Sequence, residues 1–239
     1  MKLPIFVLLL FCFQIVQAQG VTASDSTEST DYLAELKQDL SLEWPKNRAL
    51  NIVFHGHSVP AGYFKTPQVN TLAAYPHLFL KYLKTSYPTA VINSITTAIG
   101  GEQSAQGALR FQEEVLSLKP DLVFIDYALN DRRLGLEKAR TAWKSMIKAA
   151  VANQLKVVLL TPSPDLREDI LDEQTALAKH TRMIHELGQE FHIPVVDVYQ
   201  QFKTLKESGS DLSNFMSQGN HPNELGHTII LLEIVKTLF

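Results

Sequence analysis

The chain has 239 residues, a formal net charge of −3 at pH 7 and no block of basic residues. This charge pattern argues against nucleic acid and against anionic membrane surfaces as partners. The only cysteine, Cys12, lies in the apolar N-terminal segment, so we expect no disulfide and no thiol chemistry in the rest of the chain. A chain of this length can bury a large core, and we predict one folded domain.

The N-terminal segment MKLPIFVLLLFCFQIVQAQG has the pattern of a cleavable signal peptide. Lys2 supplies a positive charge, an apolar core runs from Leu3 to Val16, and the small residue Ala18 precedes the expected cleavage site. The apolar core is shorter than the ~20 residues of a membrane-spanning helix, and no other stretch qualifies. We therefore predict a signal peptide over residues 1–18, a secreted or periplasmic protein, and no stable membrane insertion.

Residues 19–48 combine two patterns. The polar, acidic stretch GVTASDSTESTD has the composition of a disordered linker. The stretch YLAELKQDLSLEW has apolar residues at helical spacing, and Pro45 follows it, which predicts one short helix. Residues 49–239 form the expected folded domain.

In that domain, apolar runs typical of buried strands alternate with segments of helical periodicity. The strand candidates are LNIVFHG, AVINSITTA, DLVFIDYA, KVVLLTP and PVVDVY. Continuous Val, Ile and Leu runs are typical of parallel strands that helices cover on both faces. We predict an α/β fold, a flavodoxin-like three-layer α/β/α sandwich with a five-stranded parallel sheet in the order 2-1-3-4-5. Ligands bind such sheets at the carboxyl ends of the strands.

The segments that follow these strands carry residues suited to acyl transfer. Ser58 follows the first strand and could act as a nucleophile if a base lies beside it. Gly100 or Gly101, after the second strand, lets backbone N–H groups approach a ligand closely. The Asn130 amide, after the third, could donate to an oxygen that gains negative charge, and His221, before the last helix, could act as the base. Taken singly, the serine, the glycines and the asparagine have ordinary alternatives as turn or cap residues, and a lone loop histidine is more often a surface residue.

The conjunction of these residues is more specific than any one of them. In order along the chain, GHS, GEQS, ALND and QGNHPN resemble the four sequence blocks of the SGNH hydrolases, also called GDSL-type esterases, over residues 51–232. The resemblance implies that Ser58 is the nucleophile, that Gly101, or else Gly100, and Asn130 bind the oxyanion, and that His221 is the base. It implies no metal and no organic cofactor.

Three positions depart from the family pattern. His57 stands in place of the usual aspartate of the first block, and Ala128 in place of the usual glycine of the third. Gln218 stands where the triad aspartate is usual. A glutamine oxygen can accept the imidazole N–H, but a neutral group cannot stabilise the imidazolium by charge. Because some family members work as Ser–His dyads, we predict an active enzyme with Gln218 as a neutral orienting group. The alternatives for a displaced acid are Asp165, Asp197 and Glu224.

Substrate contacts are expected from two places. In the loop VPAGYFKTPQVNTLAAYP, Tyr63 and Phe64 could stack on a sugar ring or line an acyl pocket, the alternative being an ordered surface loop. His57 is a tentative substrate contact. Arg132 and Arg133 follow the ALND block directly and could reach an anionic substrate, although surface charge is the simpler interpretation.

Metal patterns are weak. The stretch HELGQ at His185 lacks the second histidine of a zinc-binding helix, and His221 and His227 are spaced so that they point to different helix faces.

The predicted function is a secreted serine esterase that cleaves an acyl, most simply acetyl, ester on a small-molecule or polysaccharide substrate. One alternative is a lipase-like or thioesterase activity on longer chains. The other is a catalytically inactive carbohydrate-binding protein on the same scaffold. The sequence leaves the oligomeric state open.

Overall fold

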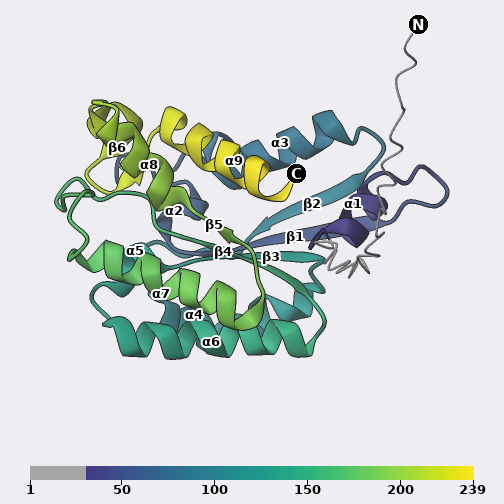
Figure 1. Cartoon of the computed structure of the whole chain (residues 1–239). Helices are drawn as coiled ribbons and strands as arrows, with labels where there is room; N and C mark the ends of the chain where they lie inside the picture. Colours follow the sequence, from purple (N-terminus) through teal and green to yellow (C-terminus); the bar gives the residue numbers. More distant parts are fainter. Residues whose placement is uncertain (1–30) are drawn as a thin grey trace, which may run out of the picture. The chain divides into compact units, whose positions relative to one another are not determined.

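Five parallel strands form the central sheet of the computed structural model, which describes residues 31–239. Their order across the sheet is β2-β1-β3-β4-β5, so the predicted fold class and strand order are confirmed. The predicted signal peptide and most of the predicted linker lie outside the described residues. The strands, drawn as arrows in Figure 1, are β1 (Ala49–Gly56), β2 (Val91–Thr96), β3 (Leu122–Asp126), β4 (Lys156–Leu160) and β5 (Val195–Val196).

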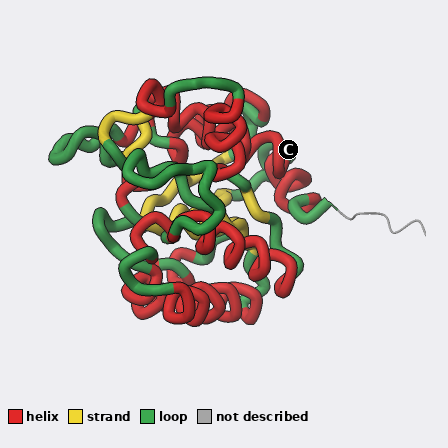
Figure 2. Tube along the Cα trace, turned by 60° about the vertical axis from the view of Figure 1, so that its left-hand side comes forward, coloured by secondary structure: helices red, strands yellow, loops and turns green. Residues whose placement is uncertain are grey.

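Helices cover both faces of the sheet and make a three-layer sandwich, which Figure 2 shows from the side. Helices α3 and α9 contact each other on one face, and α4, α6 and α7 cover the other (Figure 1). The longer helices are α1 (Ala34–Leu40), α3 (Tyr75–Ser86), α4 (Ser104–Glu114), α6 (Leu136–Ala152), α7 (Ala176–Phe191), α8 (Val198–Glu207) and α9 (Glu224–Leu238). The short elements are α2 (Ser58–Ala61), α5 (Ala128–Asp131), η1 (Thr71–Ala73), η2 (Leu116–Leu118), η3 (Leu212–Phe215), β6 (Met216–Gln218) and β7 (His221–Pro222).

The central strands fill both layers of the core because successive side chains point to opposite faces of a sheet. In β3, Leu122 and Phe124 pack with the helices of one face, and Val123 and Ile125 pack with those of the other. All four side chains are fully buried. The continuous apolar run of this strand is therefore the consequence of burial on two sides.

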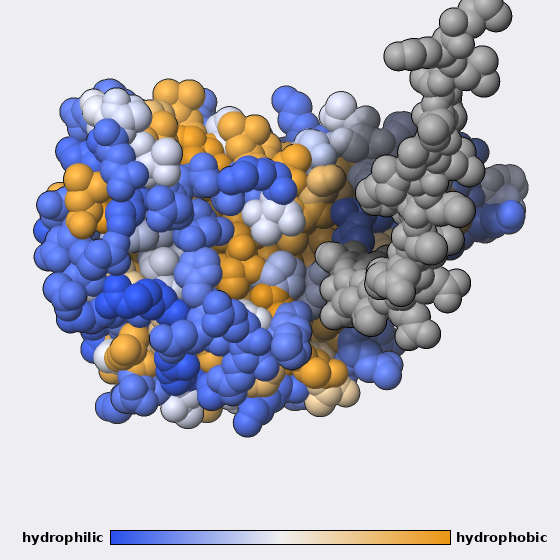
Figure 3. All heavy atoms as spheres, viewed as in Figure 1, coloured by the Kyte–Doolittle hydropathy of each residue, from blue (hydrophilic) through white to orange (hydrophobic). Residues whose placement is uncertain are grey.

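The surface reflects this layering. In Figure 3, hydrophobic side chains gather in the middle of the face in view, between α7 and α9. The end of the molecule at the carboxyl ends of the strands is mostly hydrophilic. Across the described residues, no helix combines the length and the apolar character that crossing a bilayer requires.

The prediction of a strand over the whole of PVVDVY is partly wrong. The structure keeps only Val195 and Val196 in β5, and the chain turns into α8 at Val198. The Asp197 side chain accepts the backbone N–H of Gln200 and so caps the new helix. A short apolar run with an aspartate in the middle fits a strand end followed by a capped helix as well as it fits one strand.

Helix α1 belongs to the same folded unit as the sheet. Its buried residues Leu36 and Leu40, with Leu33 just before it, join the core on the α3 and α9 side. The helix ends at Leu40, before the predicted stop at Pro45. Asp31–Phe239 is therefore one compact unit, and it begins earlier than the residue 49 expected for the domain.

Candidate active site

Ser58 and His221 lie side by side at the carboxyl edge of the sheet. The distance between Ser58 Oγ and His221 Nε2 is 2.9 Å, although 163 positions separate the two residues along the chain. Both side chains are almost fully buried. The structure thus brings together the two residues that the sequence predicts as nucleophile and base.

The backbone around Ser58 is held close to the neighbouring strand β3. A Cβ on Gly56 would lie 2.3 Å from the carbonyl oxygen of Asp126, so only glycine fits there. The next residue, His57, accepts the Val59 N–H at Nδ1 and caps the single turn of α2, which starts at Ser58. Close packing and a cap together fix the position of the serine.

The second ring nitrogen of His221 faces neutral groups. His221 Nδ1 lies 3.1 Å from the carbonyl oxygen of Phe64 and 2.8 Å from Nε2 of Gln218. The Gln218 oxygen accepts the backbone N–H of Thr66 at 3.0 Å. In this arrangement the Gln218 amide nitrogen faces Nδ1 while its oxygen accepts from Thr66, so the expected hydrogen bond from the imidazole N–H to the glutamine oxygen is not formed. The Phe64 carbonyl is the acceptor at this position.

No displaced acid replaces the missing aspartate within the described residues. Asp165 binds arginines, Asp197 binds His185 and caps α8, and Glu224 accepts a hydrogen bond from Asn70. None of the three is bonded to His221. The three alternative acids of the sequence prediction are thus engaged elsewhere.

The surroundings of His221 favour its neutral form. Burial lowers its pKa below the usual 6.5, the Phe64 carbonyl acts in the opposite direction, and the nearby His57 lowers the pKa further. A neutral imidazole can accept a proton, as a base must. His221 is therefore in the basic form at neutral pH.

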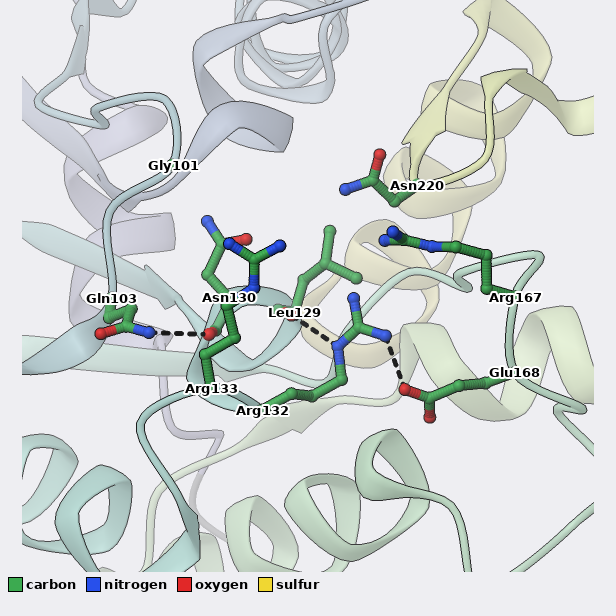
Figure 4. A pocket seen from close by; sticks show the side chains of 9 residues that line it. All are labelled: Gly101, Gln103, Leu129, Asn130, Arg132, Arg133, Arg167, Glu168 and Asn220. Atoms are coloured by element: carbon green, nitrogen blue, oxygen red, sulfur yellow. Dashed lines mark hydrogen bonds and ion pairs between the residues drawn. The ribbon is translucent and has the colours of Figure 1, made fainter.

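The predicted oxyanion donors lie at the ends of the next two strands. Gly101 has a positive φ of 81° and open space around it, whereas a Cβ on Gly100 would overlap the Tyr63 ring. Asn130, in the short helix α5, donates one amide hydrogen from Nδ2 to the carbonyl of Glu102 at 3.0 Å. The second amide hydrogen makes no hydrogen bond within residues 31–239. Gly101 and Asn130 line the same hollow, shown in Figure 4.

The predicted aromatic contacts have different positions. The Tyr63 ring packs over Gly100, with its centroid 6.0 Å from that of His221. Phe64 contacts His221 through its backbone carbonyl rather than through its ring. The loop that follows α2 therefore takes part in holding the imidazole.

His57 does not reach the surface. Its side chain is only 1% exposed, and Nε2 lies 3.3 Å from Oδ1 of Asp126 without the geometry of a good hydrogen bond. Tyr75 donates its hydroxyl to the other oxygen of Asp126 at 3.1 Å and its backbone N–H to His227. The structure does not support the tentative substrate contact of His57, because the ring is enclosed in this polar cluster.

Sequence reasoning missed this cluster of His57, Tyr75, Asp126 and His227. Burial raises the pKa of Tyr75 well above its usual value and lowers that of His227 to about 3, so both are neutral at ordinary pH. One signal was present, namely an aspartate at the end of the apolar run DLVFID.

A separate question is metal binding, and within residues 31–239 no group of three or more His, Cys, Asp or Glu side chains is arranged to hold an ion.

A serine and a histidine paired at the carboxyl edge of a parallel 2-1-3-4-5 sheet, with a glycine and an asparagine at the adjoining strand ends, define an SGNH-type ester hydrolase. The model of the GDSL-like lipase/acylhydrolase family matches residues 54–229. The chain belongs to that family. No curated protein matches the sequence significantly.

Solved structures resemble the fold at low sequence identity. A two-domain esterase active on acetylated mannans has a TM-score of 0.70 at 20% identity, over 87% of this chain. The chain spans about half of that protein, 52% of its length. A catalytic mutant of Axe2, an acetylxylan esterase from Geobacillus stearothermophilus, has a TM-score of 0.69 at 18% identity, over 79% of this chain and 94% of the other. The acetyl xylan esterase AlAXEase has a TM-score of 0.65 at 20% identity, over 80% of this chain and 100% of the other.

Proposed function

We propose that this protein is an exported serine esterase that removes acetyl groups from a carbohydrate. The observation that carries the proposal is the 2.9 Å distance between Ser58 Oγ and His221 Nε2. Family membership supports ester hydrolysis. The structural neighbours are esterases of acetylated mannan or xylan, which favours an acetylated saccharide as the substrate. Export rests on the signal-peptide pattern of residues 1–18.

In the proposed reaction, Ser58 Oγ attacks the carbonyl carbon of the acetyl ester while His221 Nε2 takes the serine proton. The carbonyl oxygen becomes an oxyanion, to which the backbone N–H groups of Ser58 and Gly101 and the free amide hydrogen of Asn130 donate. The intermediate collapses, the bond to the sugar oxygen breaks, and His221 returns the proton to that oxygen. Water then attacks the acetyl-serine by the same route and releases acetate and the free serine.

The neutral partners of His221 fit this proton cycle. In the tautomer with a hydrogen on Nδ1, the ring donates to the Phe64 carbonyl, and Nε2 is free to accept the proton of Ser58. When the ring becomes imidazolium, the carbonyl dipole stabilises its charge, although less than a carboxylate would. Gln218 accepts the backbone N–H of Thr66, and its amide nitrogen lies 2.8 Å from Nδ1, so in this tautomer it contacts the ring without a hydrogen bond to it.

The polar lining of the hollow favours a short acyl group on a polar alcohol. Among the residues around it, Leu129 is the only large apolar side chain. Long acyl chains bind in grooves that are lined mostly by apolar side chains. The lining therefore favours the acetylated saccharide over the longer-chain ester of the lipase-like alternative.

A labelling experiment tests the enzyme hypothesis. A fluorophosphonate probe should label the wild-type protein and should not label a folded Ser58→Ala variant. Nitrophenyl esters of increasing acyl length should then be cleaved with a preference for acetate. A preference for acyl chains of about eight carbons or more would replace the acetyl proposal by the lipase-like one. A folded wild type that neither labels nor cleaves any activated ester would indicate the inactive carbohydrate-binding alternative.

A further inference from the structure

A positively charged hollow adjoins the proposed oxyanion site. Its volume is about 320 Å³, near the lower end of ligand pockets in proteins. Figure 4 shows the guanidinium groups of three arginines directed into this space, with the Asn220 side chain beside that of Arg167. The lining residues are Gly101, Gln103, Leu129, Asn130, Arg132, Arg133, Arg167, Glu168 and Asn220.

A buried carboxylate holds two of the arginines in place. The side chain of Asp165 is 0% exposed, and its oxygens accept one hydrogen bond from Arg132 at 2.6 Å and two from Arg167 at 2.6 and 2.9 Å. Glu168 accepts from Arg132 at 2.6 Å and from the backbone N–H of Leu177 at 3.1 Å. Arg132 also donates to the carbonyl of Leu129. These contacts fix both guanidinium groups before any ligand binds.

Several donors at the hollow remain unused within residues 31–239. Arg133 is exposed and has no ion-pair partner there, and neither Nη1 of Arg167 nor the amide of Asn220 makes a hydrogen bond. Three guanidinium groups face two carboxylates, so the hollow keeps one positive charge, although the whole chain carries −3. A cleft of this kind attracts anions, because low-dielectric walls focus the field of its charges.

We propose that this hollow binds the anionic group of the substrate, so that the preferred substrate is an acetylated saccharide that also carries a carboxylate or a sulfate. This inference rests on the proposed function and specifies its substrate class. Guanidinium groups bind such oxyanions through paired hydrogen bonds. Because Gly101 and Asn130 line the hollow as well, an anionic group bound there belongs to the sugar whose acetyl group reaches Ser58, or to its neighbour.

The test compares acidic with neutral substrates of equal length. We expect the wild type to cleave an acetylated oligogalacturonide, or an acetylated sulfated oligosaccharide, with a kcat/KM at least tenfold above that for an acetylated xylo-oligosaccharide. The two acidic substrates distinguish carboxylate from sulfate. Arg133→Gln should reduce the ratio of acidic to neutral kcat/KM at least fivefold, and Arg133→Lys should reduce it less. Equal kcat/KM for acidic and neutral substrates, or an unchanged ratio in Arg133→Gln, would overturn the inference.

Arg48→Gln provides the matched control. Arg48 is a half-exposed arginine at the amino end of β1, at the opposite edge of the sheet, where it pairs with Asp39 and Asp121. Removing its charge changes the net charge by the same amount as Arg133→Gln, and the ratio of acidic to neutral kcat/KM should stay that of the wild type. A loss of preference equal to that of Arg133→Gln would indicate a general charge effect and no site at the hollow.

A binding measurement separates this inference from the proposed function. Calorimetric titration of Ser58→Ala with an oligogalacturonide and with a sulfated oligosaccharide should show binding. In the double variant that also carries Arg133→Gln, this binding should be at least tenfold weaker. Binding should also weaken as salt rises from about 50 mM to about 500 mM, because salt screens exposed charges. Cleavage of nitrophenyl acetate together with equal binding of acidic and neutral saccharides would support the proposed function and overturn the inference. Absence of ester cleavage together with Arg133-dependent binding would overturn the proposed function and support the anion site.

Discussion

The carbonyl oxygen of Phe64 lies 3.1 Å from Nδ1 of His221, while the other ring nitrogen, Nε2, faces Ser58. This backbone group occupies the place of the carboxylate that orients the imidazole in a Ser–His–Asp triad. Gln218, at the sequence position of that carboxylate, turns its amide nitrogen toward the ring. The loop after Ser58 thus supports both partners of the nucleophile and base pair.

Replacing Gln218 by alanine should be far less harmful than replacing His221. With Phe64 still accepting from Nδ1, we expect Gln218→Ala to lower kcat roughly tenfold, against ~10⁴ or more for His221→Ala, since the base is lost only in the second variant. The measurement is kcat on 4-nitrophenyl acetate, with circular dichroism as the check on folding. Equal and near-complete losses would show that Gln218 is an obligatory third member of the site.

The pH profile should show the lowered pKa of His221. Burial is the main cause of the shift, so the base stays deprotonated below its usual titration range. We expect the acid limb of kcat/KM to have its midpoint below pH 6.5. Gln218→Glu places a negative charge near Nδ1, which favours the imidazolium and raises the pKa, so its acid limb should move to higher pH. A midpoint that stays unchanged would show that the new carboxylate does not face the ring.

Removing the Asn130 side chain should impair turnover strongly. An amide donor to the oxyanion is typically worth ~10² to 10³ in kcat, and we expect a loss of this size for Asn130→Ala. Because Asn130 also donates to the Glu102 carbonyl, the melting temperature of the variant must be compared with that of the wild type. A loss below about fivefold in a fully folded variant would assign Asn130 to loop structure alone.

The Tyr75 hydroxyl should contribute to stability. It is buried and donates to Asp126, so Tyr75→Phe leaves one carboxylate oxygen without that donor and should destabilise the fold by about 1–3 kcal/mol. Urea unfolding measures this change. Tyr82→Phe, in the same helix, is the matched control, because the structure records no hydrogen bond for its hydroxyl within the described residues, and it should have little effect. Similar effects of both substitutions would argue against a special contribution of the Tyr75 to Asp126 bond.

The sequence by itself determined the layered fold and the order of its strands. The apolar runs of the central strands and the helical spacing between them specify burial on two faces, and parallel strands place Ser58, Gly101 and Asn130 at one edge. The same local pattern was ambiguous at PVVDVY, where Asp197 starts a helix after two strand residues.

Only the tertiary structure decided which groups surround His221 and the hollow. The acceptor at Nδ1 is a backbone carbonyl, which every residue possesses, so no residue type could indicate Phe64. The pairing of Asp165 with Arg132 depends on how two loops meet at the edge of the sheet. Periodicity records which side chains are buried, but contacts between distant loops arise from packing.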